Sequence, residues 1–90
     1  MRIVWDEVKR QTNLQRRGLD FADLEDGFEW ANMLLVPAHP GLDGRPRVMA
    51  VAMMNGKLMT IVFAPLGSEA ISIVTMRRAS QSERRNYDRR

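Results

Sequence analysis

Basic side chains recur near the start of the chain at a spacing that an α-helix would gather on one side. Lys9 is followed four, seven and eight residues later by Asn13, Arg16 and Arg17. Because an α-helix turns once every 3.6 residues, these side chains share one face. Arginine stays protonated and grips phosphate with a planar fork, and lysine adds a compact point charge. The face is therefore suited to holding an anion such as a phosphate.

The end of the chain forms a second basic region. Residues 71–90 carry six Lys/Arg against two Asp/Glu, whereas residues 1–30 carry five against seven. A compact positive patch raises the local concentration of anions, so this asymmetry suggests nucleic acid or an acidic protein surface as a partner. Arg77 and Arg78 are adjacent on an expected strand and would point to opposite faces of it. On composition alone, a solvated and solubilising tail stays open as the alternative.

The residues also limit the reactions that the chain could catalyse. There is no cysteine and one histidine, His39, so neither a metal site nor a cofactor is expected. A metal-free ribonuclease needs only cations around the phosphorane and groups that move two protons. Glu83, Tyr87 or Lys9 with a lowered pKa would have to move them. The capping box with Ser80 accounts fully for Glu83, packing accounts for Tyr87, and His39 between two prolines is expected to be exposed and idle.

Helix signals stand first in the chain. Asp6 is suited to capping a helix over about Glu7–Arg17, and Gly18 to closing it. Asp20 is suited to capping a second, shorter helix, which Gly27 would end.

Strand signals follow. Four stretches read as strands: Met33–Val36, Arg47–Met53, Leu58–Ala64 and Ile71–Met76. Asn55-Gly56 is the preferred pair for a two-residue hairpin turn, and Ser80 with Glu83 forms the signature of a capping box. We therefore expect one α+β domain over residues 1–90, with two N-terminal helices, an antiparallel sheet of about four strands, and a C-terminal helix, the helices covering one face. No stretch has the length of a membrane span or the character of a signal peptide, so we expect a soluble cytoplasmic protein. The residues alone predict a basic α+β domain with RNA as a candidate ligand.

The two ends of the chain resemble a known family. The opening "IVWDEVKRQTNLQRRGLDF" is similar to the start of the BrnT family, with six residues at matching positions: Trp5, Asp6, Lys9, Asn13, Gly18 and Phe21. The closing "IVTMRRASQSERRNY" is similar to its end, again with six: Arg77, Ala79, Ser80, Glu83, Arg84 and Tyr87. Between them, Arg47 matches an arginine that opens a family strand. The resemblance covers nearly the whole chain.

This resemblance implies a RelE-like fold and a function. BrnT proteins are ribonuclease toxins of bacterial type II toxin–antitoxin systems. The resemblance implies a metal-independent endoribonuclease that slows growth by cleaving RNA, with Lys9, Arg47 and Arg77 around the scissile phosphate. Arg16, Arg17 and Arg78 would position the RNA. The implied partner is a BrnA-like antitoxin, a dimeric ribbon-helix-helix protein that silences the toxin and brings the complex to operator DNA.

Two departures from the family pattern keep other functions open. Arg16-Arg17 stands where the family usually has Lys-His, which removes a histidine suited to acid–base work, and Ser72 stands in place of an arginine. A catalytically degenerate module that only binds its antitoxin is therefore one alternative. A nonspecific nucleic-acid-binding protein is another.

Overall fold

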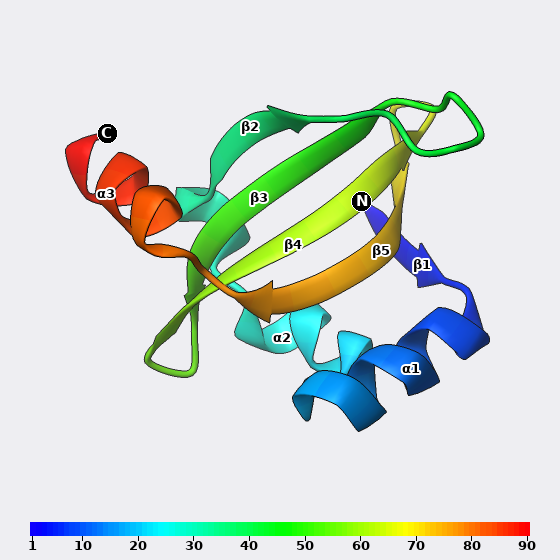
Figure 1. The fold of residues 1–90 in the computed structure, drawn as a ribbon, viewed down its shortest axis with the longest axis horizontal. Helices are drawn as coiled ribbons and strands as arrows, with labels where there is room; N and C mark the ends of the chain where they lie inside the picture. The colour runs from blue at the N-terminus through cyan, green and yellow to red at the C-terminus, as the bar shows by residue number, and fades with distance from the viewer.

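A five-stranded mixed sheet forms the centre of the computed structural model, which describes residues 1–90 (Figure 1). Its strands are β1 (Arg2–Trp5), β2 (Leu34–Ala38), β3 (Arg47–Met54), β4 (Lys57–Leu66) and β5 (Ala70–Arg78). They lie in the order β1-β5-β4-β3-β2. The helices are α1 (Glu7–Arg17), α2 (Leu24–Gly27) and α3 (Gln81–Arg89), with short 3₁₀ turns at Phe21–Asp23 and Trp30–Asn32. None of the helices combines the length and the hydrophobicity that a membrane span requires.

The expected antiparallel sheet of about four strands was wrong. Residues Arg2–Trp5 form a fifth strand, which pairs with β5 in parallel, so that Arg2 lies opposite Ala70 and Trp5 opposite Ile73. A four-residue segment has too little alternation to be recognised by itself, and its partner lies at the other end of the chain. The sheet is therefore mixed, and β1 brings the start of α1 to the side of β5.

The expected second N-terminal helix was also wrong. The chain makes a 3₁₀ turn at Phe21–Asp23 and then a single α-helical turn, α2. Gly27 lies so close to the sheet that a Cβ there would stand 3.1 Å from Cγ of Met54, and Phe28 makes an isolated β-bridge to Met54. Pairing with the end of β3 thus replaces the continuation of the helix.

Predictions that depend on residues adjacent in sequence, namely the ends of α1 and the hairpin turn, are confirmed. Asp6 caps α1 by accepting a hydrogen bond from the Val8 amide (2.8 Å), and Gly18 closes the helix at φ 69°. Asn55 and Gly56 both have positive φ, 52° and 79°, as the two-residue turn between β3 and β4 requires.

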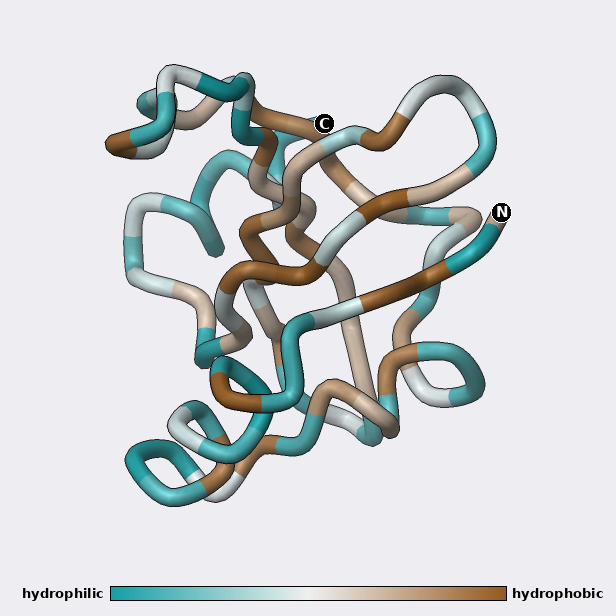
Figure 2. Tube along the Cα trace, turned by 90° about the vertical axis from the view of Figure 1, so that its right-hand side faces the viewer, coloured by the Kyte–Doolittle hydropathy of each residue, from teal (hydrophilic) through white to brown (hydrophobic).

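The core fills one face of the sheet. Phe21 and Leu24 are fully buried against sheet residues such as Ile61 and Ile73. Burying one such side chain contributes roughly 1.5–3 kcal/mol, so this short segment fastens the N-terminal half of the chain to the sheet. Figure 2 shows the apolar strands running through the middle of the molecule, with hydrophilic turns outside them.

The opposite face of the sheet is covered only at one end, by α3. Thr60 and Arg77 lie opposite each other on β4 and β5, next to Ile61 and Met76 of the core, and so point away from it. Both hydrogen-bond Glu83 of α3. The expectation that all helices cover one face is therefore corrected, and the rest of this second face stays open.

Candidate functional site

A β-bulge lies where α1 crosses β5. Val62 and Phe63 are neighbours on β4 but pair with Thr75 and Ile73, which leaves Val74 as an extra residue on β5. A bulge bends its strand and re-aims the side chains around it. Val74 lines two hollows on this side of the molecule.

Asn13 holds α1 beside this bulge. Its side chain is 5% exposed, and its Oδ1 accepts hydrogen bonds from Oγ1 of Thr75 (3.0 Å) and the backbone N–H of Met76 (3.1 Å). Its Nδ2 donates to the carbonyl oxygen of Leu19 (3.0 Å). Asn13, which the helical spacing placed on the basic face, is therefore buried and bonded to the sheet. Asn13 fixes the helix face that carries the basic residues against the sheet.

The first hollow lies along α1 and is rich in cations. Its lining residues come from α1 and the β5 bulge: Val8, Lys9, Thr12, Asn13, Arg16, Arg17, Val74 and Thr75. Lys9, Arg16 and Arg17 are exposed, and none of them makes a salt bridge. The three cations that the helical spacing placed on one face are thus together and free to bind an anion.

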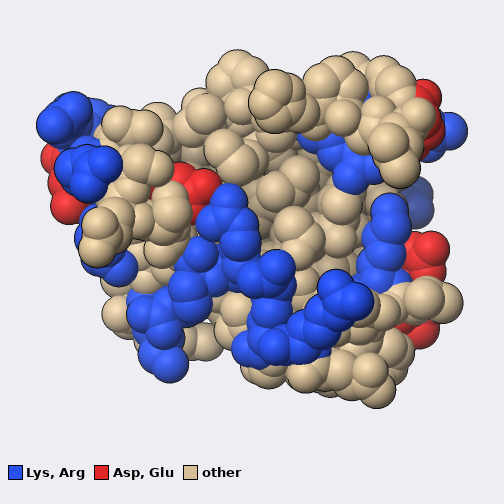
Figure 3. Space-filling model, viewed as in Figure 1, with Lys and Arg blue, Asp and Glu red and all other residues tan.

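The second hollow lies between α1 and the loop that joins β2 to β3. Its lining residues are Lys9, Pro40, Gly41, Leu42, Asp43, Arg47 and Val74. Lys9 and Val74 line both hollows, which are therefore adjacent, and we call the two together the basic groove. Figure 3 shows Lys and Arg side chains in a band across this face, and a further group recessed beneath the β2–β3 loop.

Arg47 is enclosed by the β2–β3 loop. Its Nε is buried without a hydrogen-bond partner, and a Cβ on Gly41 would stand 2.7 Å from its Cζ. A side chain at position 41 would therefore displace the guanidinium from its place beneath the loop. Asp43 lies near enough that the charges of Arg47 and Arg45 help to lower its carboxyl pKa, after the larger effect of a hydrogen bond from the Arg45 amide.

Arg77 lines neither hollow, and its guanidinium is bound by a carboxylate. Its two terminal nitrogens donate to the two carboxylate oxygens of Glu83, both at 2.7 Å. Thr60 and the Ser80 amide donate to the same carboxylate, each at 2.8 Å. These partners, Arg77 foremost, lower the pKa of Glu83 to about 2. Glu83 is therefore an ionised cap at neutral pH and has no proton to donate.

The other predicted residues also lie outside the basic groove. Arg78 ends β5 and is exposed, and Tyr87 stacks against the Arg90 guanidinium, 3.7 Å from the ring centre. His39 is exposed and lines a separate hollow beside Pro37 and Met49. Of the residues considered for proton transfer, only Lys9 lies in the groove.

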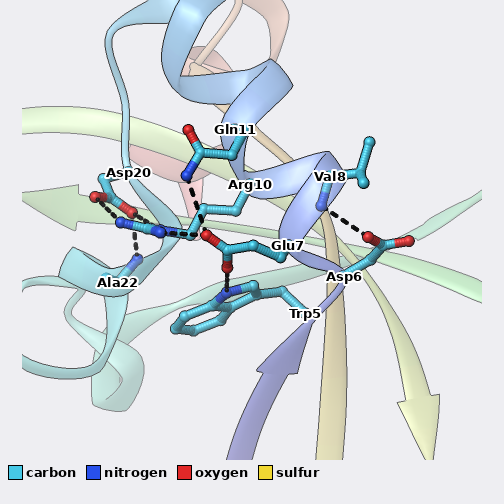
Figure 4. A network of polar contacts seen from close by, with 8 residues as sticks. All are labelled: Trp5, Asp6, Glu7, Val8, Arg10, Gln11, Asp20 and Ala22. Atoms are coloured by element: carbon cyan, nitrogen blue, oxygen red, sulfur yellow. Dashed lines mark hydrogen bonds and ion pairs between the residues drawn. The ribbon is translucent and has the colours of Figure 1, made fainter.

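Arg10 of α1 does not line the groove, because acidic side chains bind its guanidinium. Arg10 donates to both oxygens of Asp20, at 2.7 and 2.9 Å, and to Glu7, as Figure 4 shows. The indole N–H of Trp5 donates to Glu7 as well (3.2 Å). This network ties the first turns of α1 to β1 and to the Asp20 turn. Arg10 is therefore structural, although the sequence alone does not distinguish it from Lys9.

Comparison with known proteins identifies the family of this chain. A family model described as "Ribonuclease toxin, BrnT, of type II toxin-antitoxin system" matches residues 5–83. The structure is similar to the 1.1 Å crystal structure of the Brucella abortus ribonuclease toxin BrnT, with a TM-score of 0.71 and 44% sequence identity, covering 90% of this chain and 99% of that one. No curated protein matches. The chain belongs to the BrnT family of ribonuclease toxins of type II toxin–antitoxin systems.

Proposed function

We propose that this protein is a metal-independent endoribonuclease that binds single-stranded RNA along the basic groove. The observation that carries the proposal is the position of Lys9, which lines both hollows and so joins the cations of α1 to Arg47 of β3. An RNA backbone is a row of phosphates, and a row of unpaired cations is its electrostatic complement. Such contacts supply affinity and position the RNA but carry little sequence information.

The cations divide into two groups in this proposal. Lys9 and Arg47 lie on either side of the scissile phosphate, and Arg16 and Arg17 hold the phosphates that flank it in the groove. Arg78, which is exposed outside the groove, contacts the RNA beyond it. Arg77 belongs to the same basic surface, but Glu83 occupies its fork. We therefore assign Arg77 the role of fixing α3 and adding positive potential. A direct contact to phosphate would require RNA to displace the Glu83 carboxylate.

The reaction needs no metal in this proposal. The 2′-hydroxyl gives its proton to water while its oxygen attacks the neighbouring phosphorus, the bond from phosphorus to the 5′-oxygen breaks, and the products end in a 2′,3′-cyclic phosphate and a 5′-hydroxyl. The lysine and arginine charges stabilise the phosphorane through which this exchange passes. Arginine is effectively never deprotonated, so Lys9 is the groove cation with a proton to give to the departing 5′-oxygen.

The antitoxin completes the proposal. We propose a BrnA-like ribbon-helix-helix dimer that silences the toxin in the cytoplasm and alone carries the contacts to operator DNA. Membership of a toxin–antitoxin family supports an antitoxin partner. The basic groove favours an acidic antitoxin segment, which would exclude RNA by occupying the same cations.

A second candidate is a module that binds its antitoxin without cleaving RNA. The observation in its favour is that no histidine lines the groove, where Arg16-Arg17 stands in place of the usual Lys-His. Acid–base catalysis would then rest on Lys9 with no imidazole nearby.

Induced expression separates the two candidates. Growth and total RNA integrity are followed for the wild type, Lys9→Ala and the control Lys57→Ala, whose side chain is exposed at the β3–β4 turn. The ribonuclease predicts growth arrest with RNA loss in the wild type and in Lys57→Ala, and neither in Lys9→Ala. Intact RNA and normal growth with all three proteins would favour the binding module.

A further inference from the structure

The second hollow contains more than a phosphate site requires. Beside Lys9 and Arg47 it has one carboxylate, Asp43, and apolar walls from Pro40, Leu42 and Val74. Its volume is about 560 Å³, within the range of pockets that hold small ligands, roughly 300–1,000 Å³. A carboxylate serves no purpose in holding a phosphate, since like charges repel. Apolar side chains also contribute nothing to phosphate binding, but they can pack against the flat face of a nucleobase.

Asp43 is held in place and ionised. Its Oδ1 accepts a hydrogen bond from the Arg45 amide (3.0 Å), and this bond, with the nearby arginines, lowers the pKa of its carboxyl. Its second oxygen lies 3.8 Å from Nε of Arg45, too far for a hydrogen bond, and the side chain is half exposed. One oxygen thus shapes the turn, and the other makes only a long ion pair with Arg45 and can still accept a hydrogen bond from a donor that enters the hollow.

Leu42 stands at the tip of the same loop. Its side chain is fully exposed, at the mouth of the hollow that Pro40 and Val74 line. Unstacked bases of single-stranded RNA pack on apolar and aromatic side chains while their Watson–Crick edges are read by polar groups. Leu42 and Pro40 supply such a surface next to Asp43, and Lys9 connects it directly to the phosphate path.

An ionised carboxylate only accepts hydrogen bonds, and this limits which base it selects. The Watson–Crick edge of guanine presents two adjacent donors, N1–H and the N2 amino group. Adenine, cytosine and uracil each present one donor group beside acceptors, which a carboxylate repels. Guanine is therefore the base that pairs with the fewest unfavourable contacts.

We propose that this hollow is a base-binding subsite in which Asp43 selects guanine next to the cleaved phosphate. The inference rests on the proposed RNA cleavage, since it specifies the substrate of the same groove. It assigns to Asp43 a role in specificity and none in the reaction itself. Lys9 and Arg47 keep their contacts to phosphate.

Binding of uncleavable RNA tests the subsite without relying on catalysis. Short single-stranded oligonucleotides are made with 2′-O-methyl groups, which remove the attacking hydroxyl, and differ only in one central base. Fluorescence anisotropy measures the affinity of the wild type, Asp43→Asn and the control Asp26→Asn, whose side chain is exposed on α2. The amide oxygen of the introduced asparagine preserves the acceptor for the Arg45 amide, so the loop keeps its turn.

The wild type and Asp26→Asn are expected to bind the guanine oligonucleotide roughly fivefold or more tightly than the others, as for one well-formed base contact. Asp43→Asn is expected to lose this preference while binding the other three oligonucleotides as well as the wild type does. Equal binding of all four bases by the wild type would overturn the inference. So would a guanine preference that survives in Asp43→Asn.

Cleavage of the matching unmodified RNAs separates the subsite from the proposed function. Guanine-selective binding without cleavage would retain the subsite and remove the ribonuclease. Cleavage without base preference would do the reverse. An equal loss of cleavage at every base in Asp43→Asn would place Asp43 in the reaction and overturn its assignment to specificity.

Discussion

Arg77 and Glu83 form a two-pronged ion pair that joins the end of β5 to the first turn of α3, with both N···O distances at 2.7 Å. The arginine was expected to face a phosphate, and the glutamate to cap a helix. The capping box is present, but its carboxylate also receives both prongs of the arginine and the hydroxyl of Thr60. Glu83 therefore attaches α3 to the sheet. It also binds the guanidinium of Arg77, which the family resemblance assigned to RNA.

Replacing Glu83 with glutamine should destabilise the fold. The substitution leaves the Arg77 guanidinium, 27% exposed, without its counter-charge, and weakens the cap of α3. Hydrogen bonds to charged groups contribute about 1.5–3 kcal/mol each in such settings, and partial solvent screening brings the expected loss to roughly 2 kcal/mol. Urea unfolding measures it, with the exposed Glu29→Gln as the matched control. Equal midpoints for the two variants would show that the pair contributes nothing.

The same pair predicts how stability depends on pH. The pKa of Glu83 is about 2 in the folded protein and has an ordinary value of 4.5, so below about 4.5 the unfolded chain binds the proton first. The ionised Glu83 therefore makes its full contribution to the free energy of unfolding above about pH 4.5, and this contribution is lost as the pH falls toward 2. Thermal unfolding between pH 6 and pH 2, roughly spanning both values, should show a shallower decline in Glu83→Gln than in the wild type. Parallel curves would contradict the assignment. Asp20 and Glu7, whose pKa values are also lowered, supply part of the remaining decline.

Asn13→Ala should loosen α1 from the sheet. The change removes the acceptor for the Thr75 hydroxyl and the Met76 amide, and leaving such buried groups unpaired costs about 1–3 kcal/mol. Urea unfolding gives the total loss, and hydrogen exchange at the Met76 amide reports the site itself. Gln15→Ala, exposed on the same helix, is the control and should change neither. Unchanged protection at Met76 would mean that Asn13 does not hold the two elements together.

Gly41→Ala should weaken RNA binding without unfolding the protein. The added Cβ would collide with the Arg47 guanidinium and push it out of its place beneath the loop. Loss of one charge-assisted contact, about 1.5–3 kcal/mol, corresponds to a decrease of roughly tenfold or more in affinity for a single-stranded RNA. Anisotropy titration measures it, and circular dichroism confirms the fold. Wild-type affinity in this variant would show that the position of Arg47 is unimportant for RNA.

Features set by neighbouring residues were predictable from the sequence. The bounds of α1, the Asn55-Gly56 turn and the capping box at Ser80 depend on residues within a few positions of one another, so the local pattern contains them. The prediction of a second N-terminal helix was wrong because the end of that helix depends on residues distant in sequence. Contact between Gly27 and Met54, distant in sequence, ends it.

Partners far apart in sequence account for the other errors. β1 finds its place only by pairing with β5, and Asn13 is buried only because Thr75 and Met76 bind it from more than sixty positions away. For the site, the spacing of Lys9, Arg16 and Arg17 predicted that they share one helix face, and in the structure all three line one hollow. Nothing in the spacing shows that Arg10 is bound by acids or that Asp43 lies beside Arg47, because both depend on the tertiary fold.

Under the proposed function, Lys9, which lines both hollows, is essential to a metal-independent ribonuclease. This role is tested most directly by measuring how purified protein cleaves a single-stranded RNA in the presence of EDTA. We predict that the wild type and Lys57→Ala cleave the RNA at equal rates and leave a 2′,3′-cyclic phosphate. Lys9→Ala should be slower by a factor of about a hundred or more, the usual scale of a lost proton donor. Equal cleavage by Lys9→Ala and the wild type, or cleavage that EDTA abolishes, would contradict the account.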